Sequence, residues 1–292
     1  MHTRPRRSAL YMPGSNARAL EKAKSLPADV VIFDLEDAVA PEAKEAARMQ
    51  VMEAVAAGGY GSREIVVRIN GLDTPWGAKD LAQAAAAAPN AILVPKVSSP
   101  HQLAEVASGL EGAPAKIGVW AMIETPLAVL NLRDIAAAAR DSATRLACFV
   151  MGTNDLVKET RAELDASRTA ALYWLSAAVT AARAYGIEVL DGVYNAFKDA
   201  DGLWRECLQG RQLGMDGKTL IHPDQIATAN EVFSPSAEEV AFARKIIAAF
   251  AEPQNQGKGA ITLDGRMVEL LHAETARRTV AIAEAIAARE GA

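Results

Sequence analysis

The sequence predicts a (β/α)8 TIM barrel with a C-terminal helical extension. Short apolar runs alternate with helical segments, eight such runs precede residue 234, and no glycine-rich phosphate-binding turn follows the first run. Eight βα units in succession are typical of this barrel, whereas a doubly wound sheet usually has fewer strands and carries such a turn. Half of the 292 residues are apolar, which is enough for a large core. We therefore predict one barrel domain, since barrels often reach this length as a single unit.

The eight apolar runs are predicted to be the barrel strands. Each is bounded by polar or turn-forming residues, as expected for strands that are buried on both faces of a parallel sheet. In chain order the strands are expected at Ala9–Met12, Val30–Phe33, Ile65–Ile69, Ala91–Val94, within Ile117–Thr125, within Cys148–Leu156, at Ile187–Leu190 and at Lys218–Ile221.

Proline, glycine and capping residues mark the intervening helices. Ser15 is a candidate N-cap, and Pro41 and Pro126 occupy the favoured first helical position. Gly186 is a plausible glycine just past a helix end. The predicted helices run from Ser15 to about Ser25, onward from Pro41, from Pro75 to about Ala88, onward from Pro100, over Pro126–Arg140, from about Ser167 to Tyr185, and over Gly202–Leu213.

The chain after the eighth strand differs in character and is predicted to be a separate extension. We place the barrel at residues 1–233 and the extension at residues 234–292, divided at the Phe233–Ser236 break. The extension is expected to contain a helix at Ala237–Ala251, a polar linker at Gln254–Lys258, a hairpin at Ala260–Val268 turning at Asp264-Gly265, and a last helix from Leu270 to about Ala287. Because a barrel is complete without it, the extension is expected to cover a core of its own or that of a neighbouring subunit.

Charge and cysteine usage narrow the classes of function. The formal net charge of −5 argues against binding to nucleic acid or to a membrane surface, both of which need a basic face. We find neither a secretory signal nor an apolar run of about 18 residues that could span a membrane. Cys148 and Cys207 lie far apart, which favours reduced thiols over a disulfide framework. We expect a cytoplasmic protein.

Polar side chains gather at the predicted strand ends. The loops that follow parallel strands meet at one face of a barrel, where barrel active sites are found. The residues at or just after the predicted strand ends are Asp34, Glu36, Asp37, Arg68, Asn70, Lys96, Glu124, Asp155, Asp191 and His222.

Two apolar runs, IGVWAMIET and CFVMGTNDL, each end in a carboxylate, Glu124 in the first and Asp155 in the second. Two carboxylates from neighbouring strands can share one hard cation such as Mg²⁺, which prefers oxygen ligands and keeps some of its water. The alternative is that each carboxylate caps the helix that follows it. Their equivalent placement favours the metal.

Other chemistries fit the strand-end residues less well. The histidines form neither a Ser-His-Asp arrangement nor a Cys/His zinc cluster. Lys96 is a candidate Schiff-base lysine, although an ion pair with the acidic loop Asp34–Asp37 is the simpler interpretation. The remaining chemistry is catalysis by a divalent metal that polarises a carbonyl, with Arg68 stabilising an enolate or alkoxide.

Specific strings along nearly the whole chain carry a family resemblance. They are RSALYMPGS, DLEDAVAP followed by Lys44 and Arg48, VRINGLDTPW, LVPKV, MIET, MGTNDL, LDGVYNAFKD, GKTLIHPDQI and NEVFSPS. With these strings the sequence resembles the citrate lyase β-subunit/malyl-CoA lyase family of the HpcH/HpaI aldolase superfamily. The resemblance implies a Mg²⁺-dependent barrel that breaks or forms a carbon–carbon bond in the CoA thioester of a 3-hydroxy acid.

The resemblance also assigns roles to residues of this chain. Glu124 and Asp155 match the metal ligands, with Glu124 also near the substrate, and Arg68 matches the substrate-binding arginine. Tyr11 and Lys22 match positions that contact CoA or substrate. Asn16 stands where malyl-CoA lyases carry a basic residue, a role that Arg18 is positioned to take over. The candidate catalytic residues are Arg68, Asp37 and Glu269.

Glu269, in the string RMVEL, departs from the family pattern. The family usually has aspartate there, acting as acid/base from a neighbouring subunit. The resemblance therefore implies that the extension, residues 234–292, packs on a neighbouring subunit of a homo-oligomer, which is expected to be a trimer or hexamer. Glutamate is one methylene longer, and misplacing a catalytic group by about 1 Å costs rate. From the sequence alone, Glu269 is also a favourable carboxylate at a helix start.

Three functions are left open. The leading expectation is a Mg²⁺-dependent acyl-CoA lyase for malyl-CoA, methylmalyl-CoA, citramalyl-CoA or citryl-CoA. The strings MGTNDL and DGVYNAF and the glutamate at 269 are similar to a malyl-CoA thioesterase branch, which makes hydrolysis the alternative. A third alternative is a citrate lyase β-like subunit that works on an acyl-carrier partner.

Overall fold

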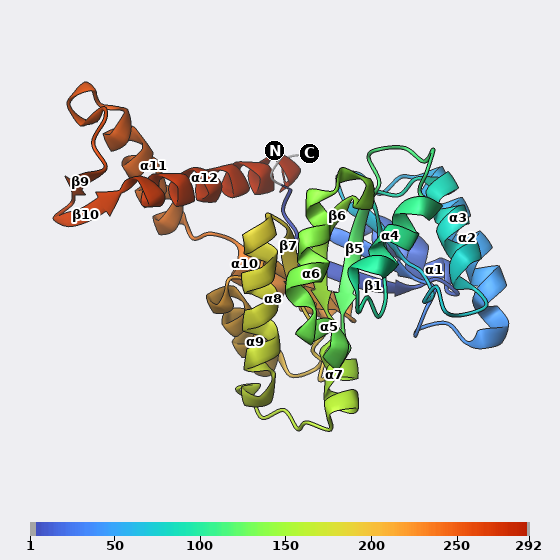
Figure 1. The fold of residues 1–292 in the computed structure, drawn as a ribbon. Helices are drawn as coiled ribbons and strands as arrows, with labels where there is room; N and C mark the ends of the chain where they lie inside the picture. The colour runs from blue at the N-terminus through green and yellow to red at the C-terminus, as the bar shows by residue number, and fades with distance from the viewer. Residues whose placement is uncertain (1–3, 291–292) are drawn as a thin grey trace. The chain divides into compact units, whose positions relative to one another are not determined.

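The computed structural model describes residues 4–290 and contains a closed barrel of eight parallel strands (Figure 1). The strands follow one another around the barrel in chain order, and β1 closes it by pairing with β8, with Ala9 opposite Thr219. This confirms the barrel predicted from the sequence. The strands are β1 (Ser8–Pro13), β2 (Val30–Asp34), β3 (Glu64–Arg68), β4 (Ala91–Val94), β5 (Gly118–Ile123), β6 (Leu146–Met151), β7 (Glu188–Asp191) and β8 (Gly217–Leu220).

Helices surround the strands and cover their outer faces. The α-helices of the barrel are α1 (Ala17–Lys22), α2 (Lys44–Ala57), α3 (Gly77–Ala87), α4 (Pro100–Gly109), α5 (Pro126–Leu130), α6 (Leu132–Ala137), α7 (Thr153–Thr160), α8 (Leu172–Tyr185), α9 (Ala200–Leu213) and α10 (Ile226–Phe233). Short 3-10 turns precede or follow several of them, as at Pro41–Ala43 before α2 and Thr169–Ala171 before α8.

Two local predictions were wrong. The segment Pro126–Arg140 is two α-helices and a 3-10 turn instead of one helix, because Asn131 leaves helical geometry at φ −100° and ψ 9°. The N-cap of α1 is Asn16 instead of Ser15. The Asn16 side chain accepts a hydrogen bond from the Ala19 backbone N–H at 3.1 Å, so the amide takes the capping role.

Two apolar layers hold the barrel together. The interior is filled by side chains such as Val30, Val66 and Trp120, which are fully buried, and a larger layer packs between the strands and the helices. At the amino ends of the strands, the Arg6 guanidinium pairs with Glu64 and lies 4.8 Å from the Trp120 ring centroid. The barrel is therefore a packed core, and its chemistry is confined to the loops at its ends.

The described residues from Ser234 onward belong to a second compact unit, while Arg6–Phe233 forms the first. Its elements are α11 (Ala237–Ala251), β9 (Ala260–Leu263), β10 (Arg266–Glu269) and α12 (Leu270–Glu290). It has a core of its own, which includes Ile246, Ile261 and Val268. The strands β9 and β10 form the expected antiparallel hairpin, with both turn residues, Asp264 and Gly265, at positive φ.

Both cysteines, Cys148 and Cys207, are buried free thiols. Among residues 4–290, no helix combines the length and the apolar character that crossing a membrane requires.

Candidate active site

An acidic loop after β2 and an arginine at the end of β3 form the most tightly organised part of the barrel's carboxyl face. Arg68 directs Nε and Nη2 to the two oxygens of Asp34, each at 2.6 Å, in a bidentate ion pair. Its third nitrogen, Nη1, lies 2.9 Å from Glu36 Oε2 and 3.1 Å from Asp37 Oδ2. The structure therefore brings these predicted strand-end charges together in one cluster. The Nε and Nη2 atoms of Arg68 bind Asp34, and only Nη1 faces the carboxylates of Glu36 and Asp37.

Asp34 is held as a carboxylate. Burial opposes its charge, but Arg68 and backbone N–H groups, which include those of Glu36 and Ala38, outweigh burial and keep the pKa of Asp34 below its ordinary value. The ring of Tyr11, a residue within β1, lies with its centroid 4.8 Å from the Arg68 Cζ atom. Burial is the largest effect on Tyr11 and raises its pKa. Arg68 opposes this rise and the neighbouring carboxylates add to it, so the phenol keeps its proton.

Buried side chains from α2 and from the loop after β3 fix the backbone of the acidic loop. Lys44 Nζ donates to the carbonyl oxygens of Leu35 and Glu36 at 2.9 and 2.7 Å. Asn70 donates to the Leu35 carbonyl at 2.9 Å and is itself held by Asp80. These contacts explain why an irregular loop at the barrel mouth can hold its carboxylates in place.

Glu36 lies between two cations and is buried, with 8 % of its surface exposed. Lys96 Nζ is 3.6 Å from Oε1, which confirms the expected ion pair between Lys96 and the acidic loop. Burial is the largest effect on Glu36 and, with the nearby Asp37 and Asp34 charges, it raises the pKa of Glu36 to about 7 despite Arg68 and Lys96.

Glu124 directly follows β5 and is 1 % exposed. Its Oε1 accepts a hydrogen bond of 2.7 Å from the Lys96 backbone N–H. Gly152 packs so closely on this side chain that a Cβ at position 152 would overlap Glu124. Burial, then the charge of Glu36, with a further contribution from Asp155, raises the pKa of Glu124 to about 8.

Asp155 does not lie at the end of a strand, so its predicted placement was wrong. The strand β6 ends at Met151, and Asp155 lies in the first turn of α7, so it is not equivalent to Glu124 in backbone position. It nevertheless acts electrostatically on both Glu124 and Lys96, which places its charge at the same site. A carboxylate in the first turn also favours the helix, so the capping alternative and the metal hypothesis are compatible.

The donor set fits a hard divalent cation. Glu124 and Asp155 are carboxylates. Burial is the main cause of the raised pKa of Glu124, the charges of Glu36 and Asp155 add to it, and a bound cation would offset these effects. Within residues 4–290 no group of three or more histidine, cysteine or acidic side chains converges on one point. Two carboxylates suit Mg²⁺, which usually keeps several waters and is held by one or two carboxylates together with substrate oxygens.

The remaining predicted site residues make other contacts. Lys22 is the exposed last residue of α1. Asp191 is fully buried and pairs with Arg168 at 2.8 Å and with Lys218 at 3.1 Å, so it serves the structure of the barrel end. His222 is partly exposed and stacks on Phe197. Glu269 ends β10 in the second unit, where its backbone N–H donates to His272 Nδ1.

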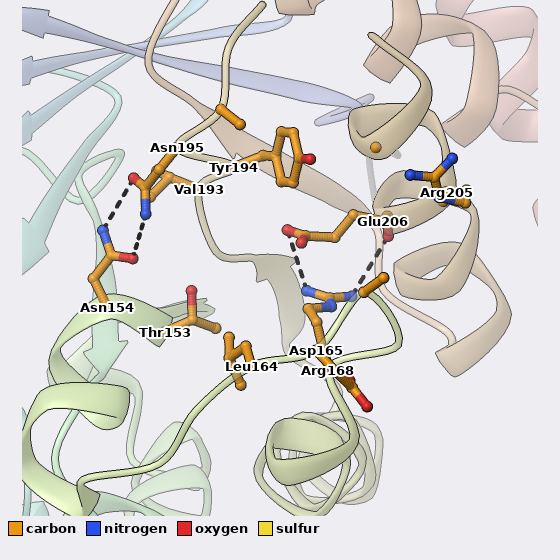
Figure 2. A pocket seen from close by; sticks show the side chains of 13 residues that line it. Thr153, Asn154, Leu164, Asp165, Arg168, Val193, Tyr194, Asn195, Arg205 and Glu206 are labelled. Carbon is orange, nitrogen blue, oxygen red and sulfur yellow. Dashed lines mark hydrogen bonds and ion pairs between the residues drawn. The ribbon is translucent and has the colours of Figure 1, made fainter. Parts of the chain in front are cut away.

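A cavity of about 330 Å³ adjoins the start of α7 and was not foreseen from the sequence (Figure 2). Asn154, next to Asp155, and Asn195, from the loop after β7, form one wall of the cavity and exchange two amide hydrogen bonds of 2.8 and 3.3 Å. Arg168 and Glu206 form another wall. No local motif could reveal this pairing, because the two asparagines are 41 residues apart.

The fold and these residues define a class: a (β/α)8 barrel whose carboxyl face carries the carboxylates Glu124 and Asp155 together with a buried arginine. The family model for the HpcH/HpaI aldolase/citrate lyase family matches residues 7–223. The chain belongs to this family, which confirms the resemblance found in the sequence.

Several relatives match over nearly the full length. The chain is 50 % identical to a (3S)-malyl-CoA thioesterase of Cereibacter sphaeroides over 97 % of this chain and 96 % of that protein. It is 33 % identical to the citrate lyase subunit beta of Escherichia coli, over 99 % of this chain and 96 % of that one. A crystal structure of protein CitE from Mycobacterium tuberculosis, in complex with magnesium, acetoacetate and coenzyme A, aligns with a TM-score of 0.75 and 31 % identity, covering 96 % of this chain and 99 % of that one.

Proposed function

We propose that this protein is a Mg²⁺-dependent hydrolase of (3S)-malyl-CoA. The observation that carries the proposal is the 50 % identity to (3S)-malyl-CoA thioesterases across 97 % of the chain, against 33–35 % to citrate lyase subunit beta. This changes the order of the functions left open by the sequence, in which carbon–carbon cleavage came first.

The residues of the barrel mouth suit this reaction. Glu124 and Asp155 would hold Mg²⁺, which when bound supplies polarisation of a carbonyl oxygen. Arg68 Nη1 donates to the thioester oxygen as negative charge develops there, while the Asp34 ion pair keeps the guanidinium fixed. Preorganisation of this kind is effective because the donor does not reorient during the reaction.

Further contacts follow from the family resemblance. Tyr11 and Lys22 would contact substrate or CoA, and Asp37 would act beside Arg68. Glu269 would reach the site from a neighbouring subunit as acid/base, so that a homo-oligomer is needed for activity. These assignments rest on motif positions, and the ring of Tyr11 against Arg68 supports the first of them.

A lyase remains the second candidate. It is favoured by the match to the aldolase/citrate lyase family model and by the citrate lyase beta relatives. Lyase action breaks a carbon–carbon bond and leaves the thioester intact, whereas hydrolysis releases free CoA.

One experiment separates the two candidates. Purified protein is incubated with malyl-CoA and Mg²⁺, and malate, glyoxylate and free thiol are measured together. The proposal expects malate and free CoA in equal amounts and their loss on chelation of the metal. Glyoxylate with acetyl-CoA as the main products would establish the lyase instead.

A further inference from the structure

Glu36 is a buried acidic side chain at the candidate site for which the proposed function has so far assigned no role. Among the described residues, three buried side-chain polar atoms lack a hydrogen-bond partner: Glu36 Oε2, Arg48 Nη2 and Trp120 Nε1. Only the first is an acceptor and lies at the barrel mouth. Glu36 Oε2 forms an ion pair with Arg68 Nη1, but this contact lacks hydrogen-bond geometry. An ionised carboxylate oxygen accepts hydrogen bonds and cannot donate them, so Oε2 can still accept one from a ligand that donates a proton.

The surroundings of Glu36 direct its carboxylate to the reacting end of a substrate. Oε2 is 2.9 Å from Arg68 Nη1, the nitrogen not used by the Asp34 fork, and Oε1 is 3.6 Å from Lys96 Nζ. Lys96 in turn donates its backbone N–H to Glu124. Glu36 is thus connected to the proposed carbonyl donor on one side and to a proposed metal ligand on the other.

The neighbouring carboxylates are less suited to accept a proton. Both Asp34 oxygens are occupied by Arg68, which also lowers the pKa of Asp34. The Asp37 side chain is 66 % exposed to solvent. Glu124 belongs to the proposed metal site. The charged groups that act on Glu36 are Arg68, Lys96, Asp34 and Asp37. Lys44 and Glu124 are also coupled to it electrostatically.

Resting on the proposed hydrolysis, we infer that Glu36 is the base that activates the attacking water from within the same subunit. Water gives one proton to Glu36 Oε2 and its oxygen bonds to the thioester carbonyl carbon. The carbon–sulfur bond then breaks, and the sulfur leaves with a proton from Glu269, which is the acid from the neighbouring subunit in the proposed function. The products are the free acid and the CoA thiol. Glu36 gives its proton to solvent and Glu269 takes one from solvent, so both side chains are restored. Its pKa of about 7 suits proton exchange near neutral pH.

Glu36→Gln removes the base but keeps the size of the side chain. Loss of a general base typically lowers turnover by about 10²–10⁴-fold, so malate formation is expected to fall by that factor. Glu45→Gln is the matched control, because this substitution makes the same chemical change on α2, at a side chain that is 75 % exposed. Mg²⁺ affinity measured by calorimetry is expected to be the same in the wild type and in both variants.

Changing the nucleophile separates a base from a positioning residue. Hydroxylamine attacks thioesters without prior removal of a proton, so it is expected to restore thioester cleavage by Glu36→Gln to within about tenfold of the wild type, above the enzyme-free rate. Glu36→Asp keeps a carboxylate but withdraws it, and is expected to retain partial hydrolysis. This variant carries the test if Glu36→Gln does not fold.

The outcomes distinguish the inference from the function on which it rests. A wild-type enzyme that releases no malate overturns both. If the wild type hydrolyses malyl-CoA and Glu36→Gln matches it, the inference alone is wrong. It is also wrong if hydroxylamine fails to restore cleavage while Mg²⁺ binding is intact, because Glu36 would then act by positioning Arg68 or Lys96. Restored cleavage with lost hydrolysis supports it.

Discussion

At the scale of single residues, Glu124 and Asp155, the proposed ligands of Mg²⁺, differ in how firmly the structure holds them. Glu124 is rigid, because it is buried, bonded to the Lys96 N–H and packed on Gly152. Asp155 is half-buried on the first turn of α7. We infer that Glu124 fixes the position of the metal, and that Asp155 closes the site with less restraint.

Metal binding is the first prediction at this scale. Glu124→Gln and Asp155→Asn should each weaken Mg²⁺ binding by more than the ~10–100-fold typical of losing a hydrogen-bond partner of a metal ligand. Calorimetric titration with Mg²⁺ measures this directly. Glu159→Gln, on the exposed side of the same helix, is the control and should bind normally. Full Mg²⁺-dependent turnover in both site variants would rule out the proposed ligands.

Arg68→Lys is the second prediction. Lysine keeps the charge but has a single nitrogen, so it cannot hold Asp34 through two bonds and also donate to a substrate oxygen. Losing one preorganised donor typically costs roughly 10²–10³ in turnover, and we expect a fall of that size in steady-state kcat. A near-normal rate would mean that charge alone is sufficient at this position.

At the scale of elements, a buried charge network ties β7, β8 and α9 together. Asp191 accepts hydrogen bonds from Arg168 Nη1 at 2.8 and 2.9 Å and from Lys218 Nζ at 3.1 Å, and Glu206 adds a second carboxylate. Asp191 and Lys218 are fully buried. Although burial opposes its charge, these two cations hold the pKa of Asp191 below its ordinary value.

This network gives the third prediction, which concerns stability. Asp191→Asn would leave buried cations short of a partner, and breaking a buried pair in this way typically costs about 3–5 kcal/mol. Because the native pKa is lowered, the stabilisation is present above the unfolded-state pKa and is lost as the pH falls through the native one. Urea unfolding should therefore show a large gap between wild type and variant at pH 7 that shrinks toward acid. Asp201→Asn, exposed on α9, should stay within about 0.5 kcal/mol of wild type at both pH values.

The elements also show what the sequence could and could not predict. Strand order and the strand-end residues were predictable, because buried runs ending in Glu124 or in Asp34 are local signals. The break at Asn131 and the capping by Asn16 were not, since either depends on choices between near-equal backbone conformations. The bidentate ion pair between Arg68 and Asp34 joins residues that are 34 positions apart, so it could be seen only once the folded barrel had brought β2 and β3 together.

At the scale of the whole molecule, Glu269 belongs to the second unit, whereas the other candidate site residues belong to the barrel. The second unit folds around its own core and carries Glu269 at the junction of β10 and α12. The apolar residues around it, Met267, Leu270 and Leu271, are 71 %, 52 % and 57 % exposed. Exposed apolar side chains that lie together mark interaction surfaces. This supports the proposal that the hairpin end docks on another copy of the chain.

The fourth prediction tests this arrangement with two inactive variants, Glu124→Gln and Glu269→Gln, mixed under conditions of subunit exchange. If Glu269 acts on a neighbouring barrel, an intact site forms where the barrel of a Glu269→Gln chain meets the Glu269 of a Glu124→Gln chain. Random assembly of equal amounts then restores about a quarter of the sites, and malyl-CoA turnover should rise to about that fraction of wild type. If Glu269 serves its own barrel, every site carries one lesion and the mixture stays inactive.

Two comparisons make the result unambiguous. Glu274→Gln, an exposed glutamate on α12, should leave turnover unchanged, which separates the role of Glu269 from a general effect of charge on this helix. Mixing without exchange, with the oligomers kept intact, should restore nothing, because each assembled site then retains its lesion. Full activity of Glu269→Gln alone would show that the carboxylate at this position is dispensable, and the acid/base role would pass to the carboxylates of the barrel itself.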